Sequence, residues 1–267
     1  MKYKVIVSDV DGTLFESGNQ VNDSTLKWVD AFQQAGGIFT LATGRMKKAV
    51  DLFIEQLNIQ VPVIVYNGAQ LIDPINNKLI KSYTIENELA YQVLRTVKEF
   101  QLDPILHVHQ QPYVLGITAA IEAHTLKDGI ACQVTDDAER LLQAAPTKFL
   151  IIGEPEEIQR FLEVLKQKYP HPFHHVFSDW NYLEILPMEA SKGNALKHLS
   201  GYLGIGMGEI AAVGDERNDL SMLRNAGFGA AVANANDDLK KLADYVAEGS
   251  FHRGLEEVIR KILEDVK

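Results

Sequence analysis

The sequence has a single cysteine, Cys132, among its 267 residues, so no disulfide bond can form within the chain. We expect this cysteine to behave as a small apolar residue. No apolar run approaches the roughly 18 to 20 residues that a membrane-spanning helix needs. The start, Met1-Lys2-Tyr3-Lys4, leads directly into a short apolar run without a signal-peptide pattern. We therefore expect a cytoplasmic protein without a membrane partner.

Positive charge is also scarce, because 26 Lys and Arg face 36 Asp and Glu, for a formal net charge of -10. Nucleic-acid binding depends on clustered Lys and Arg, and no such cluster occurs. An anionic small substrate would therefore need a metal ion or a few local basic groups. The 46% hydrophobic and 23% charged content indicates a globular chain with a real core rather than a disordered one.

Short apolar runs alternate with helix-period segments in the first and last thirds of the chain. Strands are expected at 5–8, 37–42, 62–66, 210–213 and 229–232, and helices at 24–35, 46–57, 195–202, 219–226 and 255–266. The strands are continuously apolar, which is typical of a parallel sheet covered by helices on both faces. This pattern predicts an α/β fold with a doubly wound parallel-sheet core.

The middle of the chain has a different pattern. It contains helix-period segments at 87–100 and 156–169 and strand-like segments at 105–110, 112–117, 149–152 and 182–186. Adjacent strands joined by a short turn indicate antiparallel pairing and an α+β module. We predict a core formed by residues 1–82 and 187–267, with an inserted α+β domain at 83–186.

Two carboxylates, Asp9 and Asp11, directly follow the first apolar strand in the sequence Asp-Val-Asp-Gly-Thr. Acids are rarely buried unless something pairs with them or coordinates them. Alternation along an extended chain places both on one side, roughly 6 to 7 Å apart, where they can approach one cation. Oxygen ligands suit Mg2+. A plain Asp-Gly turn or a calcium loop has a similar sequence and remains an alternative.

Two further clusters offer groups that can bind an anion. Thr43-Gly44-Arg45 follows the second predicted strand and provides a hydroxyl, backbone N–H groups and a helix N-terminus; a simple N-cap by Thr43 is the alternative. Lys192 lies at the start of a predicted helix, where a cation is unfavourable unless it faces an anion or a carboxylate. An exposed surface lysine is the alternative there.

The last cluster is Gly214-Asp215-Glu216-Arg217-Asn218-Asp219, which follows another predicted strand. Asp215 could supply a further metal carboxylate. Asn218 and Asp219 could coordinate the ion, bond to bound water or orient a phosphate. An acidic helix start would have the same composition.

Together, Asp9, Asp11, Thr43, Lys192 and Asp215 have the chain order found in the haloacid dehalogenase superfamily of phosphohydrolases, which this sequence closely resembles.

The stretch Tyr66-Asn67-Gly68-Ala69 and the position of the inserted domain are similar to the Cof-type branch, which has a large α/β cap after the third core strand. One departure is Arg253-Gly254-Leu255, where such proteins often have Asp-Gly-Val. Position 253 therefore lacks the acid of that pattern.

The resemblance implies a Mg2+-dependent phosphatase for small phosphomonoesters such as sugar phosphates. Asp9 would attack phosphorus and form a phosphoaspartate. Asp11 would be the general acid that protonates the leaving oxygen and the general base that deprotonates the attacking water. Mg2+ would be held by Asp9, the Asp11 backbone carbonyl and Asp215, while Asp219 would bind metal or fix Lys192.

The resemblance also implies residues for the phosphoryl group and the leaving group. Phosphoryl oxygens would be held by the Val10 and Gly44 N–H groups, Thr43, Lys192 and Asn218. Arg45 would reach substrate or simply begin its helix. The cap would close over the site and select the leaving group, with candidate contacts His107, His109, Tyr113, His174, His175 and Trp180. His107 and His109 are expected on one face, and we expect solvated histidines rather than a metal cluster that also includes His171.

Three rival functions differ in class. A dinucleotide-binding protein is disfavoured because Gly204-Ile205-Gly206-Met207-Gly208 precedes a strand and lacks the Gly-x-Gly-x-x-Gly spacing. A noncatalytic Mg2+-binding regulator and a phosphomutase using the same phosphoaspartate remain open. The sequence predicts no oligomeric state.

Overall fold

The computed structural model describes residues 1–16, 20–171 and 173–264. The chain divides into two compact units, Met1–Lys81 with Ser191–Lys267, which we call the core unit, and Ser82–Ala190, which we call the cap unit. The last two positions of the helix predicted at 255–266 lie outside the described residues. Among the helices described, none has the length and apolar character needed to cross a membrane.

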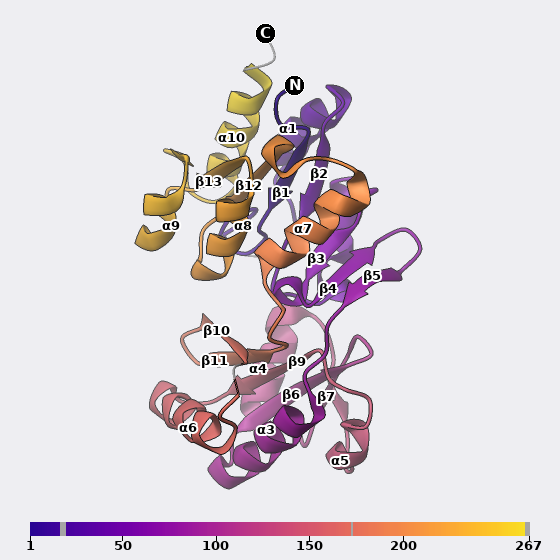
Figure 1. The fold of residues 1–267 in the computed structure, drawn as a ribbon, viewed down its shortest axis with the longest axis vertical. Helices are drawn as coiled ribbons and strands as arrows, with labels where there is room; N and C mark the ends of the chain where they lie inside the picture. Colours follow the sequence, from indigo (N-terminus) through magenta and orange to yellow (C-terminus); the bar gives the residue numbers. More distant parts are fainter. Residues whose placement is uncertain (17–19, 172, 265–267) are drawn as a thin grey trace. The chain divides into compact units, whose positions relative to one another are not determined.

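The core unit is built on a parallel sheet of five strands in the order β14-β13-β12-β1-β2. Figure 1 shows β13, β12, β1 and β2 of this sheet. The strands are β1 (Val5–Ser8), β2 (Ile38–Leu41), β12 (Ile210–Gly214), β13 (Phe228–Ala231) and β14 (Tyr245–Val246). All residues of β1 and β12 are buried, as continuously apolar strands predict. Because Ser8 pairs with both Leu41 and Val213, the carboxyl ends of three strands lie side by side.

Helices surround this sheet, and the predicted doubly wound α/β core is confirmed. They are α1 (Asp23–Gln34), α2 (Asp51–Gln56), α7 (Lys192–Leu203), α8 (Leu220–Asn225), α9 (Asp237–Leu242) and α10 (His252–Glu264), with short 3-10 helices η1 (Lys47–Val50), η2 (Tyr66–Gly68), η3 (Met207–Glu209) and η4 (Arg217–Asp219). α1 packs against α10, and α7 packs against α8 (Figure 1). The single helix predicted at 46–57 is instead η1 followed by α2.

The core unit also contains a second sheet, which holds the strand predicted at 62–66; that strand was expected in the parallel sheet. β3 (Val63–Val65) pairs antiparallel with β4 (Gln70–Asp73), and β5 (Lys78–Ser82) completes the sheet. β5 is largely exposed and has the mixed sequence Lys-Leu-Ile-Lys-Ser, so it lacks a continuous apolar run. Like β4 and β14, it was not predicted.

The cap unit has a six-stranded sheet in the order β10-β11-β9-β6-β7-β8, antiparallel except for the β7–β8 pair. Its strands are β6 (Asp103–Val108), β7 (Gln111–Val114), β8 (Gln133–Val134), β9 (Lys148–Ile152), β10 (His174–Asp179) and β11 (Tyr182–Leu186), and its helices are α3 (Asn87–Phe100), α4 (Ala119–Asp128), α5 (Ala138–Leu141) and α6 (Pro155–Lys168). The main apolar cluster joins α3 and α6 to one sheet face, and a smaller cluster joins α4 to the other. The predicted α+β organisation is confirmed, although β8, β10, α4 and α5 were not predicted.

Candidate active site

Asp9 directly follows the carboxyl end of β1, which lies between β12 and β2 in the core sheet. Its N–H donates to the Val213 carbonyl at 2.9 Å, which extends the β1–β12 pairing by one residue. The chain then turns sharply, with the Leu14 N–H donating to the Val10 carbonyl at 2.9 Å. Asp9 is only 5% exposed, so this buried carboxylate needs a partner to remain charged.

Asp215 faces this turn from the end of β12. The Thr13 hydroxyl donates to Asp215 Oδ1 at 2.9 Å. Gly12 has φ +82°, and a Cβ at this position would lie 2.1 Å from Asp215 Oδ2. Only glycine fits both the left-handed backbone and this close approach. The Asp-Gly turn is therefore present, but it packs directly on a second carboxylate.

Lys192 is buried between two acids at the start of α7. Its Nζ donates to Asp9 Oδ1 at 2.5 Å and to Asp219 Oδ1 at 2.6 Å, and the residue is 1% exposed. The Ser191 hydroxyl accepts the Asn194 N–H at 3.1 Å and caps the helix. The alternative of a solvated surface lysine is therefore wrong.

Asp219 holds Lys192 and also organises its own loop. While Oδ1 accepts from Lys192, Oδ2 accepts the backbone N–H groups of Asp215 at 3.0 Å and Glu216 at 3.1 Å. The bond from the Glu216 N–H is part of a capping box at η4. The Asp219 side chain thus has two roles: it caps the short helix, as the acidic sequence suggested, and it holds Lys192.

The electrostatics of this cluster favour a cation. Oxygen atoms of Asp9, Asp215 and Asp219 lie within 4.8 Å of one another. Burial raises the pKa of Asp9 well above its usual range, against the opposing effect of Lys192, and burial together with Asp219 raises the pKa of Asp215 to about 6. Burial disfavours the charge on Lys192, but Asp219 and Asp9 raise its pKa.

When all three carboxyl groups are ionised, three negative charges against one ammonium group leave an excess of two negative charges, which is why burial raises the pKa of Asp9 and Asp215. A divalent cation would balance that excess, and the donor set consists of carboxylate oxygens, which hard ions such as Mg2+ prefer. The residues present therefore fit a magnesium ion.

Thr43 is fully buried just beyond β2. Its N–H donates to the Ile64 carbonyl at 2.9 Å, and its hydroxyl accepts the Arg45 N–H at 3.1 Å. Thr43 therefore fixes the turn that carries Gly44. It is not the N-cap of the following helix, because that position belongs to Met46, whose side chain makes no capping bond.

Asn67, which lies in η2 just after β3, belongs to the same group of residues; the sequence pattern marks it only within the stretch 66–69 and not as a candidate site residue. It is buried, with φ +54°, and its N–H donates to the Thr43 carbonyl at 2.9 Å. Its Oδ1 accepts from Asn218 Nδ2 at 3.0 Å. The rule that selected Asp9, Thr43 and Asp215, a polar residue following a core strand, would also have selected Asn67.

Asp11 is separated from this cluster by the direction of its side chain. Its carboxylate accepts Arg45 Nε at 2.9 Å and Nη2 at 2.6 Å, and 54% of the Asp11 side chain is exposed. The site thus brings together Asp9, Asp215, Asp219 and Lys192, with Asp11 at the rim. Arg45 neither begins a helix nor lies free in solvent.

The cap histidines differ from expectation. His107 is buried on β6, whereas His109 lies beyond the end of that strand with φ +49°, so the predicted shared, solvated face is wrong. Burial lowers the pKa of His107 well below its usual range, and Lys148 adds to this effect. Among the described residues, the potential metal-binding group contains aspartates and no histidine.

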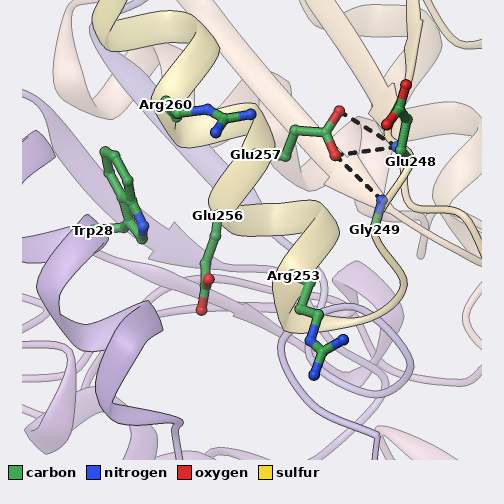
Figure 2. Close-up of a pocket in the computed structure, with 7 residues that line it drawn as sticks. All are labelled: Trp28, Glu248, Gly249, Arg253, Glu256, Glu257 and Arg260. Atoms are coloured by element: carbon green, nitrogen blue, oxygen red, sulfur yellow. Dashed lines mark hydrogen bonds between the residues drawn. The ribbon is translucent and has the colours of Figure 1, made fainter.

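A pocket elsewhere in the core unit contains none of the predicted site residues. It is lined by Trp28, Glu248, Gly249, Arg253, Glu256, Glu257 and Arg260 (Figure 2). Glu257 points to the backbone and accepts the N–H groups of Glu248 at 3.1 Å and Gly249 at 3.2 Å (Figure 2). Arg253, the position that departs from the Cof-type pattern, lines this mixed-charge pocket.

Comparison with known proteins gives concordant results. A model of the haloacid dehalogenase-like hydrolase family matches residues 6–259. The chain is 30% identical to "Phosphatase YwpJ" of Bacillus subtilis, over 97% of this chain and 100% of that one, and 30% identical to an "HMP-PP phosphatase" of Serratia proteamaculans, over 90% and 87%. A haloacid dehalogenase-like hydrolase from Bacteroides thetaiotaomicron superposes with a TM-score of 0.89 at 24% identity, covering 98% of this chain and 100% of that one.

Proposed function

This chain belongs to the haloacid dehalogenase-like hydrolase family, and we propose that it is a Mg2+-dependent phosphatase that hydrolyses small phosphomonoesters through a phosphoaspartate on Asp9. One observation carries the proposal. Asp9 is a buried carboxylate bonded to Lys192 and grouped with Asp215 and Asp219 at the end of a central strand. Strand ends of this kind are where open α/β sheets place their active sites.

In the first half-reaction, a carboxylate oxygen of Asp9 attacks phosphorus and the bond to the leaving oxygen breaks. Asp11 supplies the proton that the leaving oxygen needs. Lys192, already positioned by Asp9 and Asp219, offsets negative charge on the phosphoryl oxygens.

In the second half-reaction, Asp11 takes a proton from water as that water attacks the phosphoaspartate, and inorganic phosphate leaves. Thr43, the N–H groups of Val10 and Gly44, and Asn218 hold the phosphoryl oxygens in this proposal. Asn67 supports this group, because it bonds to both Thr43 and Asn218. The same residues therefore serve both steps.

Asp9, the backbone carbonyl of Asp11 and Asp215 are the proposed holders of Mg2+, which when bound screens the repulsion between Asp9 and the phosphoryl oxygens. Asp219 has both oxygens engaged by Lys192 and by backbone N–H groups. Its proposed role is therefore mainly to hold Lys192, although it belongs to the same oxygen cluster.

The expected substrate class follows mainly from the similar proteins, which are named as phosphatases. We expect a small phosphorylated metabolite, with a sugar phosphate as the first candidate. We propose that the cap unit selects the leaving group, because the chemistry of the core is shared by the family and specificity must come from other parts of the chain.

The test is a screen of phosphorylated metabolites with Mg2+ or with EDTA, run on the wild type and on Asp9→Asn. Asp30→Asn, an exposed carboxylate on α1, is the matched control. We expect phosphate release that EDTA and Asp9→Asn abolish and that Asp30→Asn leaves unchanged. Undiminished activity of Asp9→Asn would refute the nucleophile, no phosphate from any ester would favour a noncatalytic regulator, and isomerised product without free phosphate would indicate a phosphomutase.

A further inference from the structure

Arg45 and Asp11 form a bidentate ion pair at the rim of the site. Nε and Nη2 of its guanidinium donate to the two different oxygens of the Asp11 carboxylate, at 2.9 and 2.6 Å. Such a bidentate pair fixes the plane of a carboxylate as well as its position. A single ammonium group would fix only the distance.

Asp11 has little else to hold its side chain. The carboxyl-bearing side chain is 54% exposed, and within the described residues its oxygens accept no other side-chain hydrogen bond. An exposed aspartate would otherwise sample several rotamers. The orientation of Asp11 therefore depends on Arg45.

Arg45 is itself held rigidly, unlike Asp11. Its guanidinium carbon lies 5.4 Å from the ring centre of Phe15 and 5.8 Å from that of Phe53, and both rings are buried. Its backbone N–H donates to Thr43 Oγ1 and its carbonyl accepts the Tyr66 N–H. Because Phe15 belongs to the same turn as Asp11, Arg45 contacts that turn at two points.

We propose that Arg45 is the positioning residue for Asp11: it fixes the direction of the carboxyl group at the rim of the site, while each Asp11 oxygen keeps a second lone pair through which a proton passes to the leaving oxygen and from the attacking water. This role rests on the proposed function, since it acts only through Asp11. General acid–base catalysis contributes about 10²- to 10⁴-fold and depends on hydrogen-bonding distance to the reacting atom. A poorly oriented Asp11 should therefore lower kcat more than it changes KM.

The experiment is a double-mutant cycle of Arg45→Ala and Asp11→Asn, measured as kcat and KM for the best phosphomonoester in the screen, with Mg2+ present. Arg45→Ala should lower kcat by about 10- to 100-fold with little change in KM. In the Asp11→Asn background the same change should alter kcat by less than about twofold, because residues that act as one unit are not additive.

Two further measurements separate positioning from folding. Arg45→Lys keeps the positive charge but cannot form two parallel hydrogen bonds, so its kcat should lie between those of Arg45→Ala and the wild type. Millimolar guanidinium ion should restore part of the activity of Arg45→Ala but not of Asp11→Asn. Arg217→Ala, an exposed arginine paired with Asp238, is the control. An additive cycle, or no rescue by guanidinium, overturns the role of Arg45 while phosphatase activity stands; absence of turnover in the wild type overturns both proposals.

Discussion

Alanine substitutions at Gly12 and at Gly36 should distinguish the effect of backbone strain from the effect of displacing Asp215. Gly12 has φ +82° and Gly36 has φ +87°, so alanine costs about 1–2 kcal/mol of left-handed strain at either position. The surroundings differ, because a Cβ at Gly12 would lie 2.1 Å from Asp215 Oδ2 whereas a Cβ at Gly36 would have nothing within 4 Å. Gly36→Ala is therefore a control with matched strain and no clash.

The clash sets the expected magnitude. Ordinary contact begins at 3.4 Å, so Asp215 or the turn must shift by about 1.3 Å, and a misplacement of about 1 Å already costs roughly 10²-fold in rate. We expect kcat/KM for phosphate release to fall by about that factor in Gly12→Ala and to change less than about twofold in Gly36→Ala.

Thermal unfolding provides the accompanying measurement. Both variants should lose stability, by about 2 to 4 °C in Tm per kcal/mol of strain. Equal loss of activity in the two variants, or wild-type kcat/KM in Gly12→Ala, would refute the reasoning. The first outcome would assign the effect to general destabilisation, and the second would mean that the turn tolerates the extra methyl group.

Three other outcomes are expected. Asp219→Asn removes the negative charge that faces Lys192 but keeps the shape of the Asp219 side chain, so kcat for phosphate release should fall by about 10²-fold. The control Asp238→Asn, at an exposed position, should leave kcat unchanged. Mg2+ at about 100 times its Kd should stabilise the wild type by about 2.7 kcal/mol in thermal unfolding, and Asp215→Asn should lose most of that shift. In EDTA, the pKa of Asp215 is raised from 3.8 to about 6, so its contribution to stability is present below about pH 4 and is lost as pH rises through about 6. The Tm of the wild type relative to Asp215→Asn should accordingly fall over that interval, and a constant difference would contradict the raised pKa.

The core sheet could be predicted because burial on both faces leaves continuous apolar runs. Strand 5–8 has the predicted bounds, and the helix predicted at 87–100 also has them. β5 and β8 could not be predicted in this way, because they are short or exposed and their sequences carry no continuous apolar run. A helix was predicted at 46–57 because periodicity does not distinguish a 3-10 turn from an α-helix.

The site was predictable to the extent that parallel strands bring their carboxyl ends to one edge of the sheet. This rule assembles Asp9 and Asp215 although 206 residues separate them in the sequence. It does not give side-chain direction. Asp11 was expected beside Asp9 and instead turns to Arg45, because the chain leaves the extended conformation immediately after Asp9 and strand alternation no longer applies.

The ion pairs of Lys192 and Arg45 indicate that these two side chains alone do not attract a phosphate dianion to the site. Lys192 is bonded to two carboxylates and Arg45 to a third, so neither presents an uncompensated positive charge. Without a divalent ion, an incoming phosphate would meet a group of carboxylates with excess negative charge, and Coulomb repulsion in a buried site is strong. Mg2+ should therefore be needed to bind the phosphoryl group as well as to promote its transfer, and its removal should raise KM together with lowering kcat.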